Sequence, residues 1–248
     1  MRLFGHQLRF EQLIFWRSRE AAIFVFLLPV LLFVLLGAVY SGEIEGHQAA
    51  TWLLIGMIGY GLANTAFGGL AIFLVLRREY GILKRLRATP APAAAFLSAT
   101  VVSMLIVFAL QIVGLGALGL VFYDAEQPKA VGSFVAALLL GAATFTAMGI
   151  AGAAVIRSAE GASPIVNVVV LPMAFLSGSF GRTSEYPEVL QAIADVLPLK
   201  YFLELVRASY LDGEQIWQHG TAVAVVAAWG IGALLLGVRR FDWSPRER

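Results

Sequence analysis

The chain has 248 residues, of which 59% are hydrophobic and only 14% are charged. Soluble domains carry about 25% charged residues, so this chain cannot cover itself with a water-facing shell, and much of its surface must contact lipid. Cysteine is absent, which excludes disulfides, thiolate catalysis and cysteine-based metal sites. The three histidines, His6, His47 and His219, are scattered along the chain, so we predict no metal site and no cofactor bound by this chain.

The first 20 residues mix apolar and aromatic side chains with four arginines. Trp16 would sit at the depth of the lipid head groups, and the arginines would face anionic lipid. This composition favours an interfacial helix along the inner leaflet over an ordinary basic leader. Residues 21–40 are predicted to be a permanent signal anchor, because their basic leader is long and no small-residue cleavage site follows them.

Six stretches are long and apolar enough to cross a bilayer, which takes about 20 residues as a helix. None of them contains Asp, Glu, Lys or Arg. Because hydrocarbon offers no hydrogen-bond partners, each stretch must satisfy its own backbone and is predicted to be a helix. The fold class is therefore all-α, a polytopic membrane protein with a single transmembrane domain over residues 1–248. The predicted spans are residues 21–40, 51–76, 96–122, 131–156, 163–180 and 220–238.

Lysine and arginine set the expected orientation of these spans. With the N-terminus inside, 14 of the 18 basic residues lie in cytoplasmic segments and four lie in external ones. Loops rich in Lys and Arg stay on the cytoplasmic side of the membrane. We therefore expect a multi-pass protein of a bacterial plasma membrane with both termini in the cytoplasm.

The cytoplasmic segment 77–92 combines basic residues with a helical pattern. Tyr80, Leu83 and Leu86 recur every three residues, so one side of a short helix would be apolar, and Pro90 and Pro92 would end it. A short basic helix ended by prolines suits the docking of a soluble partner, and we predict that role. The alternative is a basic loop that only sets the topology.

Residues 181–212, after the fifth predicted span, are too charged to cross the membrane but keep helical apolar spacing. Pro198 divides them, which predicts two short amphipathic helices on the outer side, partly re-entrant. These external helices either cap the exit of a pathway or rest as a hairpin on the membrane surface. The sequence leaves both alternatives open.

Uncharged polar residues occur singly within the spans. We expect them to join helices by hydrogen bonds, and Asn64, Gln111 and Asn167 are also possible pathway residues. A carrier driven by an ion gradient needs a charged residue inside the membrane, and no predicted span has one. The P-loop pattern Gly-x-x-x-x-Gly-Lys-Ser/Thr is also absent. We therefore predict no catalytic residues and an energy supply from another chain.

Two motifs resemble those of the permease subunits of type-2 ATP-binding-cassette (ABC) exporters. Residues 78–90 are similar to the family stretch Arg-Glu-x-Gly-Thr-Leu-Glu-x-Leu-x-x-Thr-Pro after the second span, with Ile82 and Lys84 in place of the family's Thr and second Glu. The second and more specific motif runs through the fifth span and the external helices. It comprises Leu171-Pro172, residues 175–180, residues 198–201 and Arg207.

The resemblance implies a half-transporter. Two six-span permeases, as a homodimer or a related heterodimer, would each dock one copy of a separate ABC ATPase, which would bind ATP and Mg. Arg207 is expected to pair with an acidic neighbour on the external helices. The docking residues implied are Arg78, Glu79, Gly81, Leu83, Lys84, Leu86, Thr89 and Pro90, and the external signature residues are Gly178, Phe180, Pro198, Tyr201 and Arg207.

The Arg-Glu-x-Gly form of the first motif looks most like the drug and antibiotic-resistance branch of that family. Spans without charge would offer dispersion contacts to a lipophilic molecule and little to a polyanion. We therefore expect an exporter of an amphiphilic drug-like or lipid-like cargo from the cytoplasm or inner leaflet. The protein would contact the lipid bilayer, and we expect no nucleic acid among its partners. The alternatives are a non-transporting membrane assembly or regulatory subunit, and an ABC exporter of a lipid-linked glycan.

Overall fold

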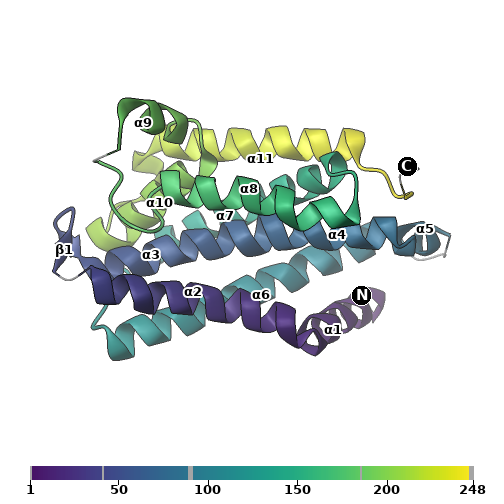
Figure 1. The fold of residues 1–248 in the computed structure, drawn as a ribbon, viewed down its shortest axis with the longest axis horizontal. Coiled ribbons are helices and arrows are strands. Elements are labelled where there is room, and N and C mark those ends of the chain that lie inside the picture. Colours follow the sequence, from purple (N-terminus) through teal and green to yellow (C-terminus); the bar gives the residue numbers. More distant parts are fainter. Residues whose placement is uncertain (1, 41, 89–91, 185, 246–248) are drawn as a thin grey trace.

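The computed structural model describes residues 2–40, 42–88, 92–184 and 186–245 (Figure 1). Within these ranges, six helical stretches are long and apolar enough to cross a membrane. The only strands in these ranges are the two short strands of one hairpin, each two residues long. The predicted fold class, an all-α polytopic membrane protein, is confirmed. The six stretches are α2 (Arg19–Val39), α3 (Ala49–Leu62) continued by η1 (Ala63–Gly69) and α4 (Leu70–Glu79), α6 (Ala93–Phe122), α7 (Val131–Val155), α8 (Ala159–Leu176) and α11 (Gly220–Arg240).

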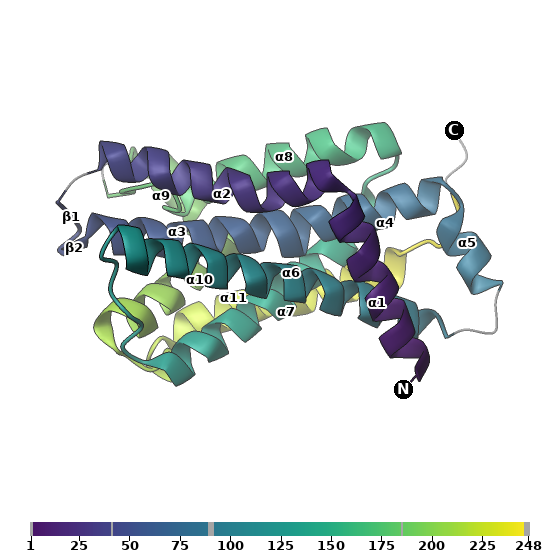
Figure 2. The ribbon, with the colours of Figure 1, turned by 90° about the horizontal axis from the view of Figure 1, so that it is seen from below.

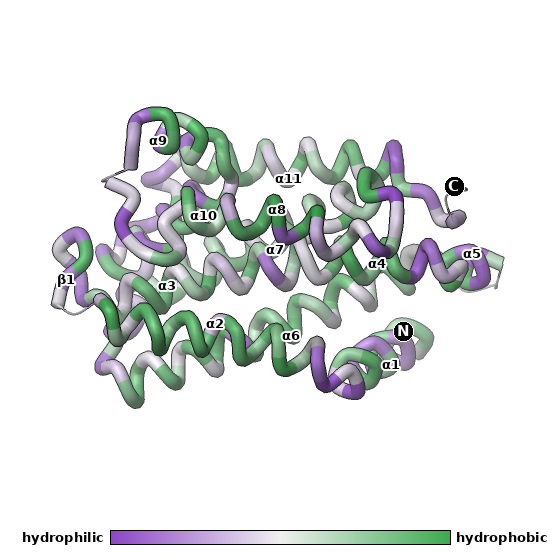
Figure 3. Tube along the Cα trace, in the orientation of Figure 1, coloured by the Kyte–Doolittle hydropathy of each residue, from purple (hydrophilic) through white to green (hydrophobic). Residues whose placement is uncertain are grey.

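The long helices lie side by side along one axis, so the bundle has two distinct ends (Figures 1 and 2). At one end, which we call the hairpin end, lie β1 (Glu43–Ile44) and β2 (His47–Gln48) with α9 (Glu188–Ala194). At the other, the α5 end, lie α5 (Ile82–Arg87), α1 (Arg2–Arg17) and both chain termini. Hydrophobic residues fill the middle of the bundle and hydrophilic ones gather toward its ends (Figure 3).

The second span is the centre of the bundle, since most of its residues are buried while α2 and α8 are largely exposed. Small residues allow this packing, because a side chain on Gly59 would overlap Leu203 and one on Gly149 would meet the carbonyl oxygens of Ala66 and Phe67. The middle turns of the second span, η1, are a π-helix. Such turns leave the regular hydrogen-bond ladder and are frequent at functional sites.

The fifth span begins and ends four residues before its predicted bounds of 163 and 180. The Ser158 side chain accepts a hydrogen bond from the Gly161 amide and caps α8 at its N-terminus. At the other end, Gly178 has φ +80, a left-handed conformation that ends the helix. The uncharged run 175–180 therefore reads as a continuation of the helix in the sequence, although its second half is a turn.

The predicted helix 77–92 is shorter than expected because α4 continues to Glu79. The chain then turns at Gly81, whose φ is +70, and α5 occupies Ile82–Arg87. The predicted docking residues Thr89 and Pro90 lie outside the described residues. Pro92 directly precedes α6, where its fixed φ suits the start of a helix.

The predicted external helices are present, but they differ in burial. The apolar residues of α9 are exposed, including Val189 and Ile193. In contrast, α10 (Pro198–Arg207) packs against α3, α7 and α11, and a side chain on Gly141 of α7 would clash with its Phe202. Helix α10 therefore packs inside the bundle at this end, which favours the re-entrant alternative for it over a hairpin resting on the membrane surface. The chain continues through η2 (Ala208–Asp212) and η3 (Ile216–Gln218) to α11.

Candidate functional site

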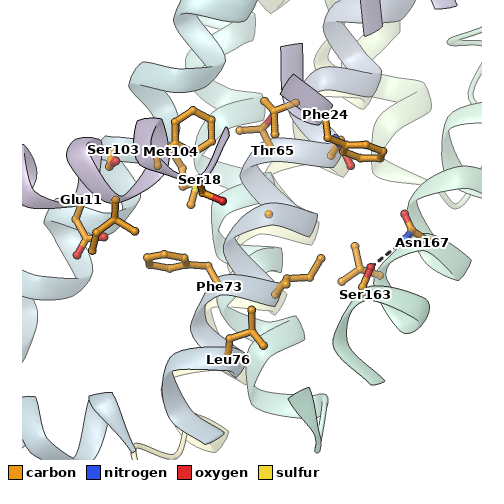
Figure 4. A pocket seen from close by; sticks show the side chains of 17 residues that line it. Glu11, Ser18, Phe24, Thr65, Phe73, Leu76, Ser103, Met104, Ser163 and Asn167 are labelled. Atoms are coloured by element: carbon orange, nitrogen blue, oxygen red, sulfur yellow. Dashed lines mark hydrogen bonds between the residues drawn. The ribbon is translucent and has the colours of Figure 1, made fainter. Parts of the chain in front are cut away.

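A cavity of about 400 Å³ lies between the central span and the helices at the α5 end (Figure 4). It reaches from α1 and the start of α2 past α6 to η1, α4 and α8. Its wall is mainly apolar, with a few polar side chains. The lining residues are Glu11, Ile14, Phe15, Ser18, Phe24, Val25, Asn64, Thr65, Gly69, Ile72, Phe73, Leu76, Ser103, Met104, Ser163, Val166 and Asn167.

Two elements that are far apart in the chain each supply a pair of polar groups to the cavity, in addition to Glu11, Ser18 and Ser103. The π-helix η1 supplies Asn64 and Thr65, and the Thr65 hydroxyl is buried without a partner among the described residues. Helix α8 supplies Ser163 and Asn167, and the Asn167 amide donates to the Ser163 hydroxyl at 3.4 Å. An apolar cavity with a few convergent polar groups suits a small amphiphilic molecule.

Two of the three possible pathway residues, Asn64 and Asn167, line this cavity, and Gln111 does not. The Gln111 amide is buried and donates a 2.8 Å hydrogen bond to the Val25 carbonyl of α2. A side chain on Gly61 of α3 would overlap the Gln111 carboxamide, so Gln111 also lies tightly against α3. Gln111 therefore joins helices, which is the role expected for most amides in membrane spans.

An ion pair that the sequence analysis missed closes the α5 end of the cavity. The Arg77 guanidinium donates to both carboxylate oxygens of Glu11 at 2.8 and 2.9 Å, and both side chains are buried. The guanidinium also lies 3.8 Å over the Phe73 ring. This pair ties α1 to the end of the central span. One signal was available, since Glu11 is the only acid between Arg2 and Arg19.

Arg78, the first predicted docking residue, is buried rather than exposed. Its guanidinium donates to the carbonyl oxygens of Ala153 and Ile156, each at 2.7 Å, and to Glu79 at 2.8 Å. The two carbonyls lie at the C-terminus of α7, where the last backbone acceptors have no helical partner. Arg78 therefore caps α7, and its contacts are inside the bundle.

The other predicted docking residues divide into two groups. Leu83 is fully buried, and Glu79, Gly81 and Leu86 are half-buried. Lys84 is exposed. Four neighbours that the prediction left out also present their side chains to the surroundings: Tyr80, Ile82, Arg85 and Arg87.

At the hairpin end, the external signature residues hold the turn after α8. The Arg207 guanidinium donates to the Gly178 carbonyl at 2.7 Å, which joins the two halves of the signature. Pro198 starts α10. The Tyr201 hydroxyl donates to the Asp195 carbonyl at 2.9 Å, and Phe180 is buried against the Tyr60 ring.

Among the described residues, no acidic neighbour on the predicted external helices forms the expected ion pair with Arg207. In place of a carboxylate, the guanidinium has the Gly178 carbonyl and lies 3.8 Å over the Trp52 ring. Arg207 lies outside the six spans, and burial lowers its pKa to about 10, while nearby Glu45 opposes that shift. The guanidinium therefore stays charged at neutral pH, and no acid in the described part of the chain is bound to it.

A family model described as ABC-2 type transporter matches residues 3–211, which is well over half of the chain. The chain belongs to this family. A comparison with curated proteins gives no match.

The match to the ABC-2 type transporter family covers the chain from α1 to η2 and leaves α11 outside. It includes both motifs that pointed to exporter permeases and all the elements that line the cavity. The protein is therefore a membrane permease subunit of an ABC transporter. Its role is transport, and the partner implied by the family is an ABC ATPase.

Proposed function

We propose that this permease exports an amphiphilic, drug-like or lipid-like molecule, and that the cavity at the α5 end admits it. The single observation that carries the proposal is the cavity itself. Its volume of about 400 Å³ falls within the range of about 300–1,000 Å³ for small-molecule sites. Its one acid, Glu11, is neutralised by Arg77, so the wall has no free charge of its own to attract an ionic cargo.

The orientation proposed places the α5 end in the cytoplasm. Most Lys and Arg residues belong to segments at that end, in agreement with the positive-inside rule. Cargo would then enter from the cytoplasm or the inner leaflet. Because the chain has no cysteine, single cysteines at Lys84 and at Glu188 can be labelled in intact cells. A membrane-impermeant reagent should reach only the cysteine at position 188, and labelling of position 84 instead would reverse the orientation.

We propose that the exposed side of the turn and α5 docks the ATPase. Tyr80 and Ile82 are 66% and 40% exposed, next to the exposed basic side chains of Lys84 and Arg85. A K84E/R85E variant should lose co-purification with the ATPase. The matched control is R239E/R240E, which makes the same charge change in an exposed pair at the same end of the bundle. Equal retention of the ATPase by both variants would rule out docking through α5.

We propose that a second permease copy covers the cavity from the side of α2 and α8. Both helices expose apolar residues along their length, among them Leu31 and Val168, and both contribute to the cavity wall. A single cysteine at position 31 should form an intermolecular disulfide, whereas one at position 235, on an equally apolar exposed part of α11, should not. Crosslinking at position 235 alone would place the partner elsewhere.

The cargo is tested by the ATPase activity of the purified complex in the presence of amphiphilic compounds and lipids. An N64L/N167L variant should lose stimulation by the active compounds, because it removes polar groups from the cavity. The control Q111L removes an amide from a span without touching the cavity and should keep the stimulation. A compound that stimulates all three complexes equally would act outside this cavity.

A further inference from the structure

A second cavity, of about 350 Å³, lies at the hairpin end, where α3, the turn after α8, and α10 meet. It is separate from the proposed cargo cavity, with which it shares no lining residue. Its residues come from four parts of the chain, within residues 45–52, 177–183 and 200–212 and at position 219. They are Glu45, His47, Trp52, Ser177, Thr183, Lys200, Glu204, Arg207, Ala208, Leu211, Asp212 and His219.

Three hydrogen-bonding groups in this cavity are buried and lack a partner among the described residues: the Trp52 indole Nε1, the Ser177 hydroxyl and the Arg207 Nε. Trp52 and Ser177 are only 6% and 3% exposed. Buried polar groups are normally hydrogen-bonded, and a buried donor without a partner costs about 1–3 kcal/mol. Three such groups lining one cavity indicate a ligand that accepts hydrogen bonds.

The surrounding contacts hold these groups in fixed positions. A side chain on Gly56 would clash with the Ser179 carbonyl, so the turn that contains Ser177 lies directly on α3. Arg207 is fixed by the Gly178 carbonyl and by the face of the Trp52 ring, against which His47 is also stacked. The three groups therefore come from α3, the turn after α8 and α10, which these contacts hold against one another around the cavity.

Within this cavity the group that suits an anionic ligand is Arg207, since the wall as a whole also holds the carboxylates of Glu45, Glu204 and Asp212. Of the acids in the wall, Asp212 lies 3.7 Å from the His47 imidazole, and Glu204 lies 3.5 Å from His219. Lys200 pairs with Asp195. Glu45 lies near enough to raise the pKa of Arg207, but no carboxylate among the described residues forms an ion pair with that guanidinium. Arg207 thus keeps a positive charge and an unused N–H in the same place.

We propose that this cavity binds a phosphate group through Trp52, Ser177 and Arg207. An indole N–H and a guanidinium N–H only donate, so the ligand must be an acceptor. A tetrahedral phosphate offers several acceptor oxygens in different directions, and arginine forms charge-assisted hydrogen bonds with it. The group is either a free anion or part of a lipid head group. The inference is independent of the proposed cargo, because it concerns another cavity.

The experiment compares the purified full-length permease with W52F, S177A and S179A variants. W52F keeps the ring under Arg207 and removes the N–H, and S177A removes one hydroxyl. The Ser179 hydroxyl is also buried and without a partner among the described residues, but Ser179 does not line the cavity, so S179A is the matched control. Thermal unfolding midpoints are measured while sodium phosphate replaces sodium chloride at constant ionic strength, and separately while phosphatidylglycerol is added to the detergent.

We expect phosphate, phosphatidylglycerol or both to raise the midpoint of the wild type and of S179A. In W52F and S177A, the concentration needed for the same rise should increase about tenfold, as expected for one lost charge-assisted hydrogen bond. A response to sodium phosphate identifies a free anion, and a response to phosphatidylglycerol alone identifies a lipid head group. The proposal is overturned if neither additive raises the wild-type midpoint, or if the four proteins respond alike.

Discussion

The two ends of the bundle are held together by different chemistry. At the α5 end, charged side chains of the central span make the joints, since Arg77 binds Glu11 of α1 and Arg78 binds the last carbonyls of α7. At the hairpin end, close backbone packing, as where Gly56 meets the Ser179 carbonyl, holds the elements together beside the single hydrogen bond from Arg207 to the Gly178 carbonyl. Among the described charged groups there, Arg207 keeps a buried donor without a partner.

This difference suggests that the two ends of the permease have different roles. Hydrogen bonds fix α1 to Arg77 and α7 to the adjacent Arg78 of α4, so a displacement of the neighbouring α5 would move both helices together. Unused donors at the hairpin end leave that end able to bind a ligand. The following variants test whether the α5 end depends on charge and the hairpin end on shape.

The largest effect is expected from E11A, which leaves the Arg77 guanidinium buried without its partner. Breaking a buried ion pair costs about 3–5 kcal/mol. Thermal unfolding of the purified permease should show a strongly lowered midpoint, and E20A, at an exposed acid nearby, should show little change. If the E11A and E20A proteins unfold alike, the ion pair does not hold the α5 end.

The next largest loss is expected from R78M, which keeps much of the side-chain volume and removes the donors. Two carbonyl oxygens at the end of α7 lose their partner, with an expected loss of about 2–4 kcal/mol. R85M, at an exposed arginine of α5, serves as the control for the change of charge. A stable R78M protein that fails to bind the ATPase would contradict the capping role and return Arg78 to the docking surface.

At the hairpin end, G56A should destabilise through shape alone. The added methyl group meets the Ser179 carbonyl, and overpacking of this kind costs about 1–3 kcal/mol. G114A, at a glycine of α6 whose added methyl would meet nothing within 4 Å, should be neutral by the same unfolding measurement. Equal midpoints for G56A and G114A would mean that the turn after α8 moves away from α3 at little cost.

The smallest effect is expected from Q111L, in the middle of the bundle between the two ends. It removes the hydrogen bond to the Val25 carbonyl, and such bonds in membrane helices average about 0.6 kcal/mol. The unfolding midpoint should fall slightly, with ATPase stimulation by cargo unchanged. Loss of stimulation without loss of stability would instead make Gln111 a pathway residue.

Much of the fold was predictable because membrane helices are determined locally. Each uncharged stretch must satisfy its own backbone in hydrocarbon, which made the six helices readable from the sequence. The bounds were less accurate where a single residue overrides an apolar pattern. Gly178, with φ +80, ends α8 in the middle of such a run.

The candidate sites were predictable only in part. Asn64 and Asn167 stood out as lone amides, and both line the cargo cavity, but the same signal also selected Gln111, which joins helices. Arg78 belongs to a basic run whose residues look equivalent in the sequence, and only packing separates it from the exposed Lys84.

By itself the sequence determined the all-α membrane fold, the number of spans and the dependence on another chain for energy. The tertiary structure alone decided that Arg77 and Arg78 point into the bundle and that His47, His219 and Arg207 line one cavity. The physical reason is the range of the interactions. Whether a helix forms in lipid is decided within each span. The surroundings of a side chain depend on distant segments, since His47 and His219, about 170 residues apart, line the same cavity.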